Sequence, residues 1–204
     1  MTMFNLDTRR PIGEFTDKAL AVGTRAVELD DEEPWGHLVV GLAHARRRRS
    51  ELAIRHLSNS VELNPSFALG HAGLGYALAV GGQPDRGVDA LELAHRFSPR
   101  DPFLANYAPV VRYMALFALK RYEETVAVCQ ATAASHPNHA GAWRLMTVSL
   151  GLLGRIDDAS EALAHTLTLQ PDLSAAHVAK DTVYADPADR ARFLEGLRKA
   201  GLKG

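Results

Sequence analysis

The sequence is poor in cysteine and in net charge, and each shortage excludes a class of protein. Cys129 is the only cysteine among 204 residues, so the chain can form neither an internal disulfide nor a thiolate metal site. Lys and Arg number 23 against 24 Asp and Glu. A general nucleic-acid binder needs a strongly positive field, which this balance does not supply. We therefore expect no nucleic-acid partner.

Membrane and strand signals are also missing. The first ten residues lack the apolar core of a signal peptide. The longest apolar runs, such as 38–43, are interrupted by Gly, His or Arg, and they fall short of the roughly 20 apolar residues that cross a bilayer. No stretch of the sequence long enough to form a strand shows the alternation of apolar and polar residues that is typical of strands. These absences predict a cytoplasmic, all-α protein with no membrane contact.

A period of about 34 residues dominates what is present. Prolines that follow helix-like apolar runs are spaced by 34, 38 and 34 positions, at Pro65, Pro99, Pro137 and Pro171. A small residue lies twelve positions before each of them, at Ala53, Gly87, Thr125 and Ala159, and a second small series has the same spacing, at Ala26, Ser60, Ala94, Thr132 and Thr166. Small residues let two helices cross closely, and proline ends a helix because it has no amide hydrogen. The pattern predicts antiparallel helix pairs that bury their apolar faces by stacking.

This pattern resembles the tetratricopeptide repeat. Val40-Gly41 and Leu74-Gly75 stand at the family's Leu-Gly position, and His71 and Trp143 stand where it often has Trp. The third unit departs from the pattern, with Tyr113 and Thr125 in place of Gly and Ala. Its four extra residues equal about one helical turn, so we expect a longer first helix there, kinked near Pro109. The resemblance implies a right-handed α-solenoid, a tetratricopeptide superhelix with C-terminal capping helices.

The repeat divides the chain into an irregular segment, a solenoid and a tail. The segments are 1–14, the solenoid 15–172 and the capping tail 173–204; within the solenoid lie a half repeat at 15–33 and full repeats at 34–67, 68–101, 102–139 and 140–172. The expected helices are 15–29, 34–46, 50–63, 68–80, 84–97, 102–119, 122–135, 139–152, 156–169, a short one near 173–180 and one near 187–200.

The solenoid begins in the middle of a repeat. Ala19 and Ala26 mark the first helix as the second member of a pair, and its apolar Phe15, Leu20 and Val22 lack a neighbour in sequence. Residues 1–14 cover this face irregularly, another chain covers it, or the chain is part of a longer polypeptide. We favour the last of these three explanations.

Residues from about 18 onward also resemble the C-terminal repeat region of bacterial class III adenylate/guanylate cyclase-like proteins. The stretches that carry this resemblance are 26–38, 63–75 and, most specifically, 186–202, which begins Asp-Pro-Ala-Asp-Arg-Ala-Arg-Phe-Leu-Glu-Gly-Leu. The resemblance implies an accessory role beside a catalytic domain. The resemblance does not imply catalytic activity, because the metal-binding aspartates and nucleotide-binding residues of a cyclase belong to a domain absent from this sequence.

A concave groove is the binding surface that the tetratricopeptide resemblance implies. Positions two, five, nine and twelve of each first helix would face inward, and from them we select Trp35, Leu38, Leu42, Leu69, Ala72, Tyr76, Ala79, Tyr107, Val110, Met114, Phe117, Arg144 and Val148 as candidate site residues. The face is aromatic and aliphatic, which suits an amphipathic helix or an extended apolar segment. The alternative is that these side chains pack against each other in a tight superhelix.

Other candidate sites have simpler interpretations. The glycine-rich stretch 70–75 lies inside a predicted helix with no strand before it, unlike a dinucleotide fingerprint. His136 and His139 lack further zinc ligands nearby, so we interpret them as a solvated turn. We expect His37 and His71, which share a repeat position, to be semi-buried packing residues that lie near one another.

The last two candidates are a basic cluster and a thiol. We interpret the arginine run 46–49 as a solvated turn rather than a contact with anionic lipid, RNA or an acidic partner. Cys129 shares its repeat position with Leu57, Leu91 and Leu163, so an inert buried thiol is expected.

No constellation in the chain predicts an enzyme, a metal site or a cofactor. The sequence therefore predicts a scaffold that binds a protein or peptide through the apolar groove. The partner is an external protein, an upstream catalytic domain, or a second copy held through the half repeat. The alternative is an accessory region of a cyclase-type signalling protein.

Overall fold

A computed structural model describes residues 12–203, and these form eleven α-helices and no strand. The half repeat is α1 (Ile12–Leu29), which begins three residues before the predicted helix. Four helix pairs follow: α2 (Pro34–Arg46) with α3 (Ser50–Leu63), α4 (Ala68–Val80) with α5 (Pro84–Phe97), α6 (Pro102–Ala118) with α7 (Tyr122–Ser135), and α8 (Ala140–Leu152) with α9 (Ile156–Leu169). The tail holds α10 (Ala175–Asp181) and α11 (Pro187–Lys199). Residues 1–11 of the expected irregular segment 1–14 lie outside the described residues, and residues 12–14 belong to α1.

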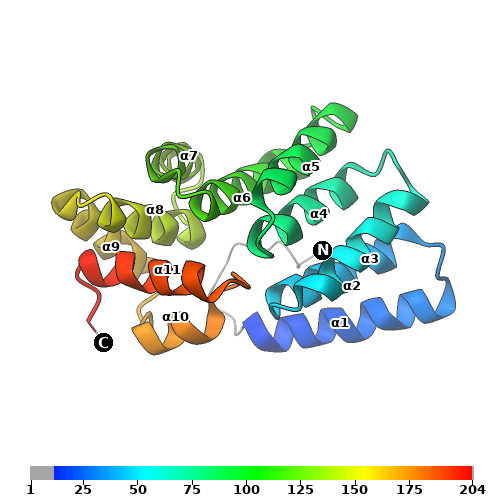
Figure 1. Ribbon diagram of the computed structural model, residues 1–204, viewed down its shortest axis with the longest axis horizontal. Coiled ribbons are helices and arrows are strands. Elements are labelled where there is room, and N and C mark those ends of the chain that lie inside the picture. Colours follow the sequence, from blue (N-terminus) through cyan, green and yellow to red (C-terminus); the bar gives the residue numbers. More distant parts are fainter. Residues whose placement is uncertain (1–11, 204) are drawn as a thin grey trace.

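The pairs stack into an α-solenoid, as the repeat predicts (Figure 1). The first helices α2, α4, α6 and α8 pack successively on one another, and each also packs on its own second helix. Both series of small residues lie at the crossings. Ala53, Thr125 and Ala159 are completely buried, as are Ser60 and Ala94 of the second series. A Cβ on Gly87 would meet the carbonyl oxygen of Gly75 at 2.8 Å, so a larger side chain there would push α4 and α5 apart.

The four extra residues of the third unit lengthen its first helix by one turn. α2, α4 and α8 have 13 residues each, whereas α6 has 17 and continues through Pro109. Asp101 begins α6 by accepting hydrogen bonds from the backbone N–H groups of Phe103 and Leu104, and Pro102 occupies the first turn, where its missing N–H costs nothing. The prediction of a longer helix instead of a bulged loop is confirmed.

One position of the first helix anchors the preceding turn in three units. His37 Nε2 lies 3.0 Å from the Asp31 carbonyl oxygen, His71 Nε2 lies 2.9 Å from that of Pro65, and Trp143 Nε1 lies 2.8 Å from that of Pro137. Each pair is separated by six residues. A carbonyl only accepts, so both histidines carry their proton on Nε2. This shared donor explains why Trp and His are interchangeable at this repeat position.

The turn inside each pair uses a left-handed residue at an equivalent position. Gly82 and Gly154 have φ of 90° and 75°, and Arg48 and Lys120 have φ of 58° and 61°. Glycine adopts this conformation without strain, whereas a side chain with a Cβ costs free energy there. The first and third units therefore have strained turns, and the second and fourth do not.

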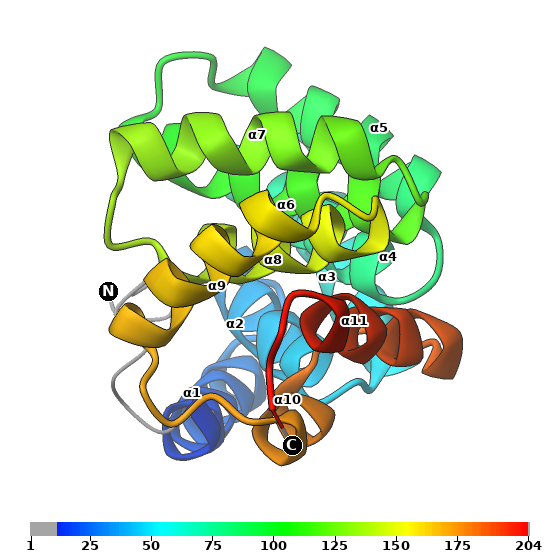
Figure 2. The ribbon, with the colours of Figure 1, turned by 90° about the vertical axis from the view of Figure 1, so that its left-hand side faces the viewer.

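The C-terminal tail folds back across the concave side of the stack. α11 packs on α8, and the tail turns toward the N-terminal half of the molecule, where α10 lies beside the start of α1 (Figures 1 and 2). Asp186 caps α11 by accepting from the Ala188 N–H, with Pro187 in the first turn, which confirms the predicted helix start. The tail thus closes the open arc of the solenoid.

Candidate functional site

The predicted groove residues line the concave side, but most of them are buried. Eight are buried (Leu38, Leu42, Ala72, Tyr76, Ala79, Tyr107, Phe117 and Val148), four are half-buried (Leu69, Val110, Met114 and Arg144), and only Trp35 is exposed. All of the buried ones except Ala79 belong to one core cluster that also holds residues of the C-terminal tail, and Leu69, Val110 and Met114 pack against it. In this conformation they do not form an open surface.

The centre of the groove is occupied by two aromatic side chains of the tail. Tyr184 lies against Phe117, with ring centroids 5.1 Å apart, and Phe193 meets the same ring edge-on at 5.7 Å. The Tyr184 hydroxyl donates to the backbone carbonyl of Met114 at 3.2 Å. Tyr184 and Phe117 are almost completely buried. Aromatic triads of this kind bury large areas, so the tail is held by apolar contact and by one directed hydrogen bond.

Further contacts tie the tail to units distant in sequence. The Ala185 N–H donates to the Val80 carbonyl at the end of α4, at 2.8 Å. Arg48, in the turn between α2 and α3, donates to the carbonyls of Ala179 and Thr182 at 3.4 and 3.1 Å. The tail therefore touches the first, second, third and fourth units. The sequence predicts only a cap for this segment, although its apolar residues at 178, 184, 193 and 197 are a signal for a buried face.

Arg144 is the polar element of the groove. Its guanidinium donates to the Gln170 side chain at 3.3 Å and lies 6.0 Å from the centroid of the Phe193 ring. Burial lowers the pKa of Arg144. The face of the Phe193 ring stabilises the charge, and Tyr113 and the Asp181 carboxylate also favour the charged form of the guanidinium. The position selected from the sequence thus contacts the tail directly.

Three histidines form a cluster between α2 and α3 that sequence reasoning missed. His37 Nδ1 lies 3.1 Å from His56 Nδ1, and the His44 ring stacks on that of His56 at 5.8 Å. Because His37 donates through Nε2 to the Asp31 carbonyl, its neutral Nδ1 accepts and His56 Nδ1 donates. His44 Nδ1 is buried without a hydrogen-bond partner. The only sequence signal was the α-helical spacing of residues 37 and 44.

The surroundings of His44 and His56 favour their neutral forms. Burial lowers the pKa of His56 to about 4, and the nearby His37, His44 and Arg55 act in the same direction. Burial, followed by Arg49, Arg47 and Arg55, also lowers the pKa of His44. Within residues 12–203, no three His, Cys, Asp or Glu side chains are placed to hold a metal ion. His37 and His71 are both buried, as expected, but their ring contacts are with His56 and Phe97.

Two interpretations of turns need correction. His139 is 4% exposed and caps α8, since its Nδ1 accepts from the Ala142 N–H at 3.2 Å; only His136 is in the solvated turn. The arginine run 46–49 is more than a solvated turn. Arg47 forms an ion pair with Asp17 of α1, and Arg48 holds the tail. Both errors arose because a local sequence window omits partners that are far away in the chain.

The remaining candidates are structural. Cys129 is completely buried, and burial raises the pKa of its thiol far above the ordinary range, which makes it a poor nucleophile. The glycines of 70–75 lie inside α4, where a Cβ on Gly70 or Gly73 would meet side chains at 2.8 Å. They serve close packing.

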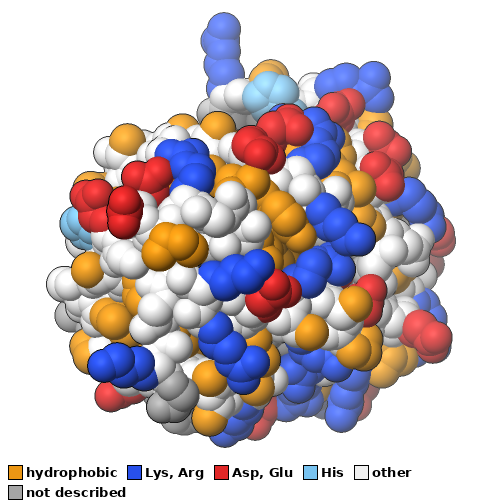
Figure 3. Space-filling view, turned by 60° about the vertical axis from the view of Figure 1, so that its left-hand side comes forward, with side chains coloured by type: hydrophobic (Ala, Val, Ile, Leu, Met, Phe, Trp, Pro, Cys, Tyr) orange, Lys and Arg blue, Asp and Glu red, His pale blue; other side chains and the backbone are white. Residues whose placement is uncertain are grey.

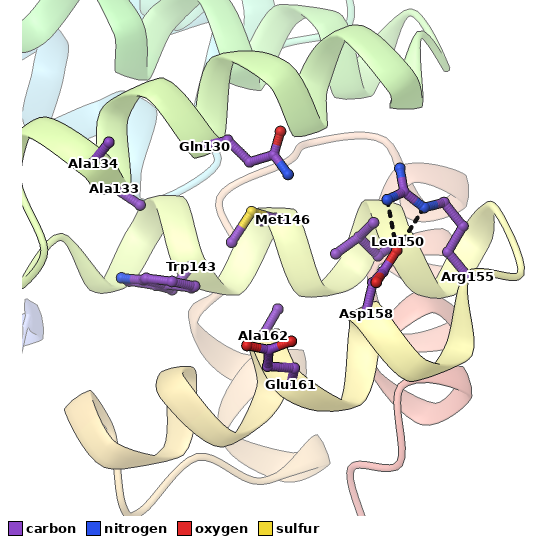
Figure 4. A pocket seen from close by; sticks show the side chains of 10 residues that line it. All are labelled: Gln130, Ala133, Ala134, Trp143, Met146, Leu150, Arg155, Asp158, Glu161 and Ala162. Carbon is purple, nitrogen blue, oxygen red and sulfur yellow. Dashed lines mark hydrogen bonds and ion pairs between the residues drawn. The ribbon is translucent and has the colours of Figure 1, made fainter.

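An open cleft lies on the other side of the stack, between α7 and α9 (Figure 4). It has a volume of about 360 Å³. Trp143, Met146 and Leu150 of α8 line it together with residues of α7, and the Arg155–Asp158 ion pair and Glu161 lie on the side of α9. Trp143 is fixed there by stacking on His165, with ring centroids 4.4 Å apart. The cleft is therefore lined by apolar side chains on one side and by charged side chains on the other.

The surface carries charges of both signs. On the face drawn in Figure 3, basic and acidic side chains are interspersed with hydrophobic ones, in line with the near-zero net charge. Over the described part of the chain, no helix combines the length and apolarity that a transmembrane span requires.

Comparisons with known proteins identify the fold. No family model and no curated protein matches the chain. Among solved structures, PilW, a widely conserved type IV pilus biogenesis factor, is 16% identical with a TM-score of 0.67, over 92% of this chain and 82% of PilW. PilF of Pseudomonas aeruginosa is 18% identical with a TM-score of 0.57, over 85% and 79%. A structure of MamA is 23% identical with a TM-score of 0.54, over 84% and 97%.

Identities this low establish the fold and leave partners open. The resemblance to cyclase-associated regions gains no support from these matches. The 34-residue period, the small residues at the helix crossings and the structural matches agree with one another. The chain is an all-α solenoid with the tetratricopeptide repeat fold.

Proposed function

We propose that the chain is a protein-interaction scaffold whose concave groove binds an apolar helical segment of a partner. The observation that supports this is the seating of Tyr184 and Phe193 against Phe117 in the groove. The tail is an amphipathic segment of the kind that helix-binding grooves accept, and here it is supplied by the same chain.

The bound tail indicates what a partner segment would need. Its two aromatic residues are nine positions apart, and Gly196 and Leu197 pack next to Phe193 on the buried face of α11, while Glu195 and Arg198 are exposed. A partner would present two bulky apolar residues and a small residue that lets its helix approach α8. Burial of that face supplies about 25 cal/mol per Å² of apolar area.

The partner is an external protein, an upstream domain or a second copy, and a cytoplasmic setting remains part of the proposal. The interaction role rests on the fold and on the occupied groove. The accessory role beside a cyclase domain rests on sequence resemblance alone, so we do not carry it further.

The test separates the tail from the groove. A protease site placed at the exposed Pro171–Asp172 turn of the folded chain yields a body, 1–172, and a tail, 173–204. Labelled synthetic tail should rebind the purified body with one-to-one stoichiometry in a fluorescence anisotropy titration. A Phe193→Ala tail should bind at least tenfold more weakly, whereas an Arg198→Ala tail, changed at an exposed position, should bind like the original.

Placing the substitutions in the peptide leaves the fold of the body unchanged. Circular dichroism of the body checks that it remains helical after the tail is removed. A folded body that does not bind the tail, or that binds the Phe193→Ala tail equally well, would refute the groove proposal.

A further inference from the structure

A second apolar surface lies along the turns between repeats. Six large apolar side chains are exposed among the described residues, and four of them lie at these turns: Leu29 (71%), Trp35 (50%), Leu63 (40%) and Phe97 (47%). Together with the half-buried Phe67, we call these residues the turn-edge ridge. Leu29, Leu63 and Phe97 are spaced by 34 residues, so they share one repeat position at the ends of α1, α3 and α5.

Ring contacts link neighbouring turns of the ridge. Trp35 lies 4.8 Å from Phe67 between centroids, and Phe97 stacks at 5.2 Å on His71, whose Nε2 bonds the Pro65 carbonyl of the same turn as Phe67. The α1–α2 and α3–α4 turns project on the same side of the molecule (Figure 1). In the next unit the equivalent position is the polar Ser135, so the ridge is confined to the first three turns.

Charge changes sign from one end of the ridge to the other. Beside Leu29 and Trp35 stand the exposed Asp30, Asp31 and Glu32. Beside Phe97, exposed Arg96 and Arg100 flank the third turn. The middle turn carries one exposed carboxylate, that of Glu62. A two-fold rotation about the middle of the ridge therefore brings acidic residues of one copy opposite basic residues of the other.

We propose that the turn-edge ridge is the interface of a two-fold symmetric homodimer, with Leu63 and Phe67 at its centre and the acidic end of each copy against the basic end of its partner. A two-fold interface must be complementary to itself, and the arrangement of acidic and basic residues along the ridge meets this condition. Exposed apolar patches rimmed by charge are typical of such interfaces. The ridge shares only Trp35 with the predicted groove residues, and the dimer leaves Tyr184 and Phe193 seated against Phe117, so the inference is independent of the proposed function.

Sedimentation equilibrium of the full chain over roughly 1–500 μM tests the dimer, a range that suits a modest interface of this kind. The average mass should rise from 22.2 kDa toward twice that value. Leu63→Glu, at the centre, should weaken association at least tenfold. The matched control is Ile156→Glu, which changes an equally exposed apolar residue outside the ridge and should dimerise like the original.

Charge reversal gives a sharper test at exposed positions that do not endanger folding. One variant carries Asp31→Lys and Glu32→Lys, and the other carries Arg96→Glu and Arg100→Glu. Each alone should be monomeric, because both ends of its ridge then carry the same sign. Mixed in equal amounts, they should form heterodimers, and association should weaken as salt is raised.

Four results would overturn the proposal. The original chain could remain monomeric over the whole range. It could dimerise with equal strength after Leu63→Glu, or weaken instead after Val22→Glu on α1, which would place the contact on another surface. The reversed variants could also fail to associate when mixed although each is folded by circular dichroism.

Discussion

Gly151 of α8 and Gly196 of α11 face each other where the tail crosses the last repeat. A Cβ on either glycine would lie well under 3.0 Å from backbone of the facing helix, at the Gly196 carbonyl oxygen in one case and the Val148 carbonyl oxygen in the other. Backbone cannot move aside as a flexible side chain can. Two residues 45 positions apart therefore set how closely the tail enters the groove.

Gly196→Ala should loosen the tail selectively. Although alanine favours helix by roughly 1 kcal/mol over glycine, the overpacking against Val148 should outweigh this gain and cost about 1–3 kcal/mol of unfolding free energy. Urea unfolding measures the loss, and limited proteolysis should show earlier cleavage in 173–186. Gly141→Ala is the matched control, because its added Cβ meets only the Tyr113 hydroxyl and the His139 ring, at 3.1 and 3.2 Å. Equal destabilisation by both variants would contradict the account.

The solenoid was predictable from sequence because its determinants repeat. Small residues recur at the helix crossings and prolines recur at the helix ends. The four repeats differ in detail, but together they show one pattern. The lengthened α6 followed from simple arithmetic, since four added residues equal one turn. Helix ranges in the sequence and in the structure accordingly differ by only a few residues at their ends.

The occupied groove was not predictable in the same way, because its determinants occur once. Tyr184 pairs with Met114 across 70 positions, and Arg48 with Thr182 across 134. These residues do not recur at the repeat spacing. The sequence on either side of each one shows only an ordinary polar or aromatic side chain. The histidine cluster was missed for a similar reason: His56 lies on the second helix, 19 residues from His37. Contacts between elements set these features, and a local sequence window does not contain them.

Arg48→Ala should loosen the start of the tail without unfolding the solenoid. The guanidinium donates to two tail carbonyls at an exposed site, so we expect a loss of no more than about 1 kcal/mol in global stability. Amide hydrogen exchange should nevertheless accelerate at Ala185, whose N–H is bonded to the Val80 carbonyl. Arg49→Ala, one residue away in the same turn, serves as control and should leave that amide protected. Unchanged exchange in the Arg48 variant would show that the arginine does not hold the tail.

Lys120→Gly should stabilise the protein. Lys120 has φ of 61° at a turn position where the second and fourth units have glycine, so the substitution removes backbone strain of about 1 kcal/mol. The greater freedom of glycine in the unfolded chain offsets part of this gain. Thermal and urea unfolding measure the difference. The reverse change, Gly154→Ala at the equivalent turn with φ of 75°, should destabilise by a similar amount. Effects of the same sign in the two variants would rule out this explanation.

Cys129 should report unfolding. The thiol is completely buried and its pKa is raised by burial, so the native protein should not react with a disulfide reagent on the minute timescale. Reaction should be complete in denaturant, and under native conditions its rate should follow the opening of α7. Cys129→Ala should lower the free energy of unfolding by about 1–2 kcal/mol through the cavity it leaves. Rapid labelling of the folded chain would contradict the buried position.

Acid should weaken the α2–α3 pair. The pKa of His56 is lowered to about 4 in the folded state by burial first, and then by His37, His44 and Arg55. The unfolded chain titrates near pH 6.5, so between these values it binds more protons than the folded chain, and stability falls as pH drops from about 6.5 toward 4. Because the ring is only partly buried, we expect a loss of roughly 1–2 kcal/mol instead of the full value that the shift implies. Urea unfolding at pH 7 and pH 5 measures it.

His56→Asn isolates the contribution of this ring. The Asn amide keeps a donor for the Nδ1 of His37 but does not titrate, so part of the difference in stability between pH 7 and pH 5 should disappear. His44, whose pKa is also lowered by burial and by Arg49, accounts for a further share, and the His44→Asn, His56→Asn double variant should flatten the dependence more than either single change. His95→Asn, at an exposed position of α5, is the matched control. If the His44→Asn and His56→Asn variants both retained the original pH dependence, as the control should, the acid sensitivity would have to arise outside the histidine cluster.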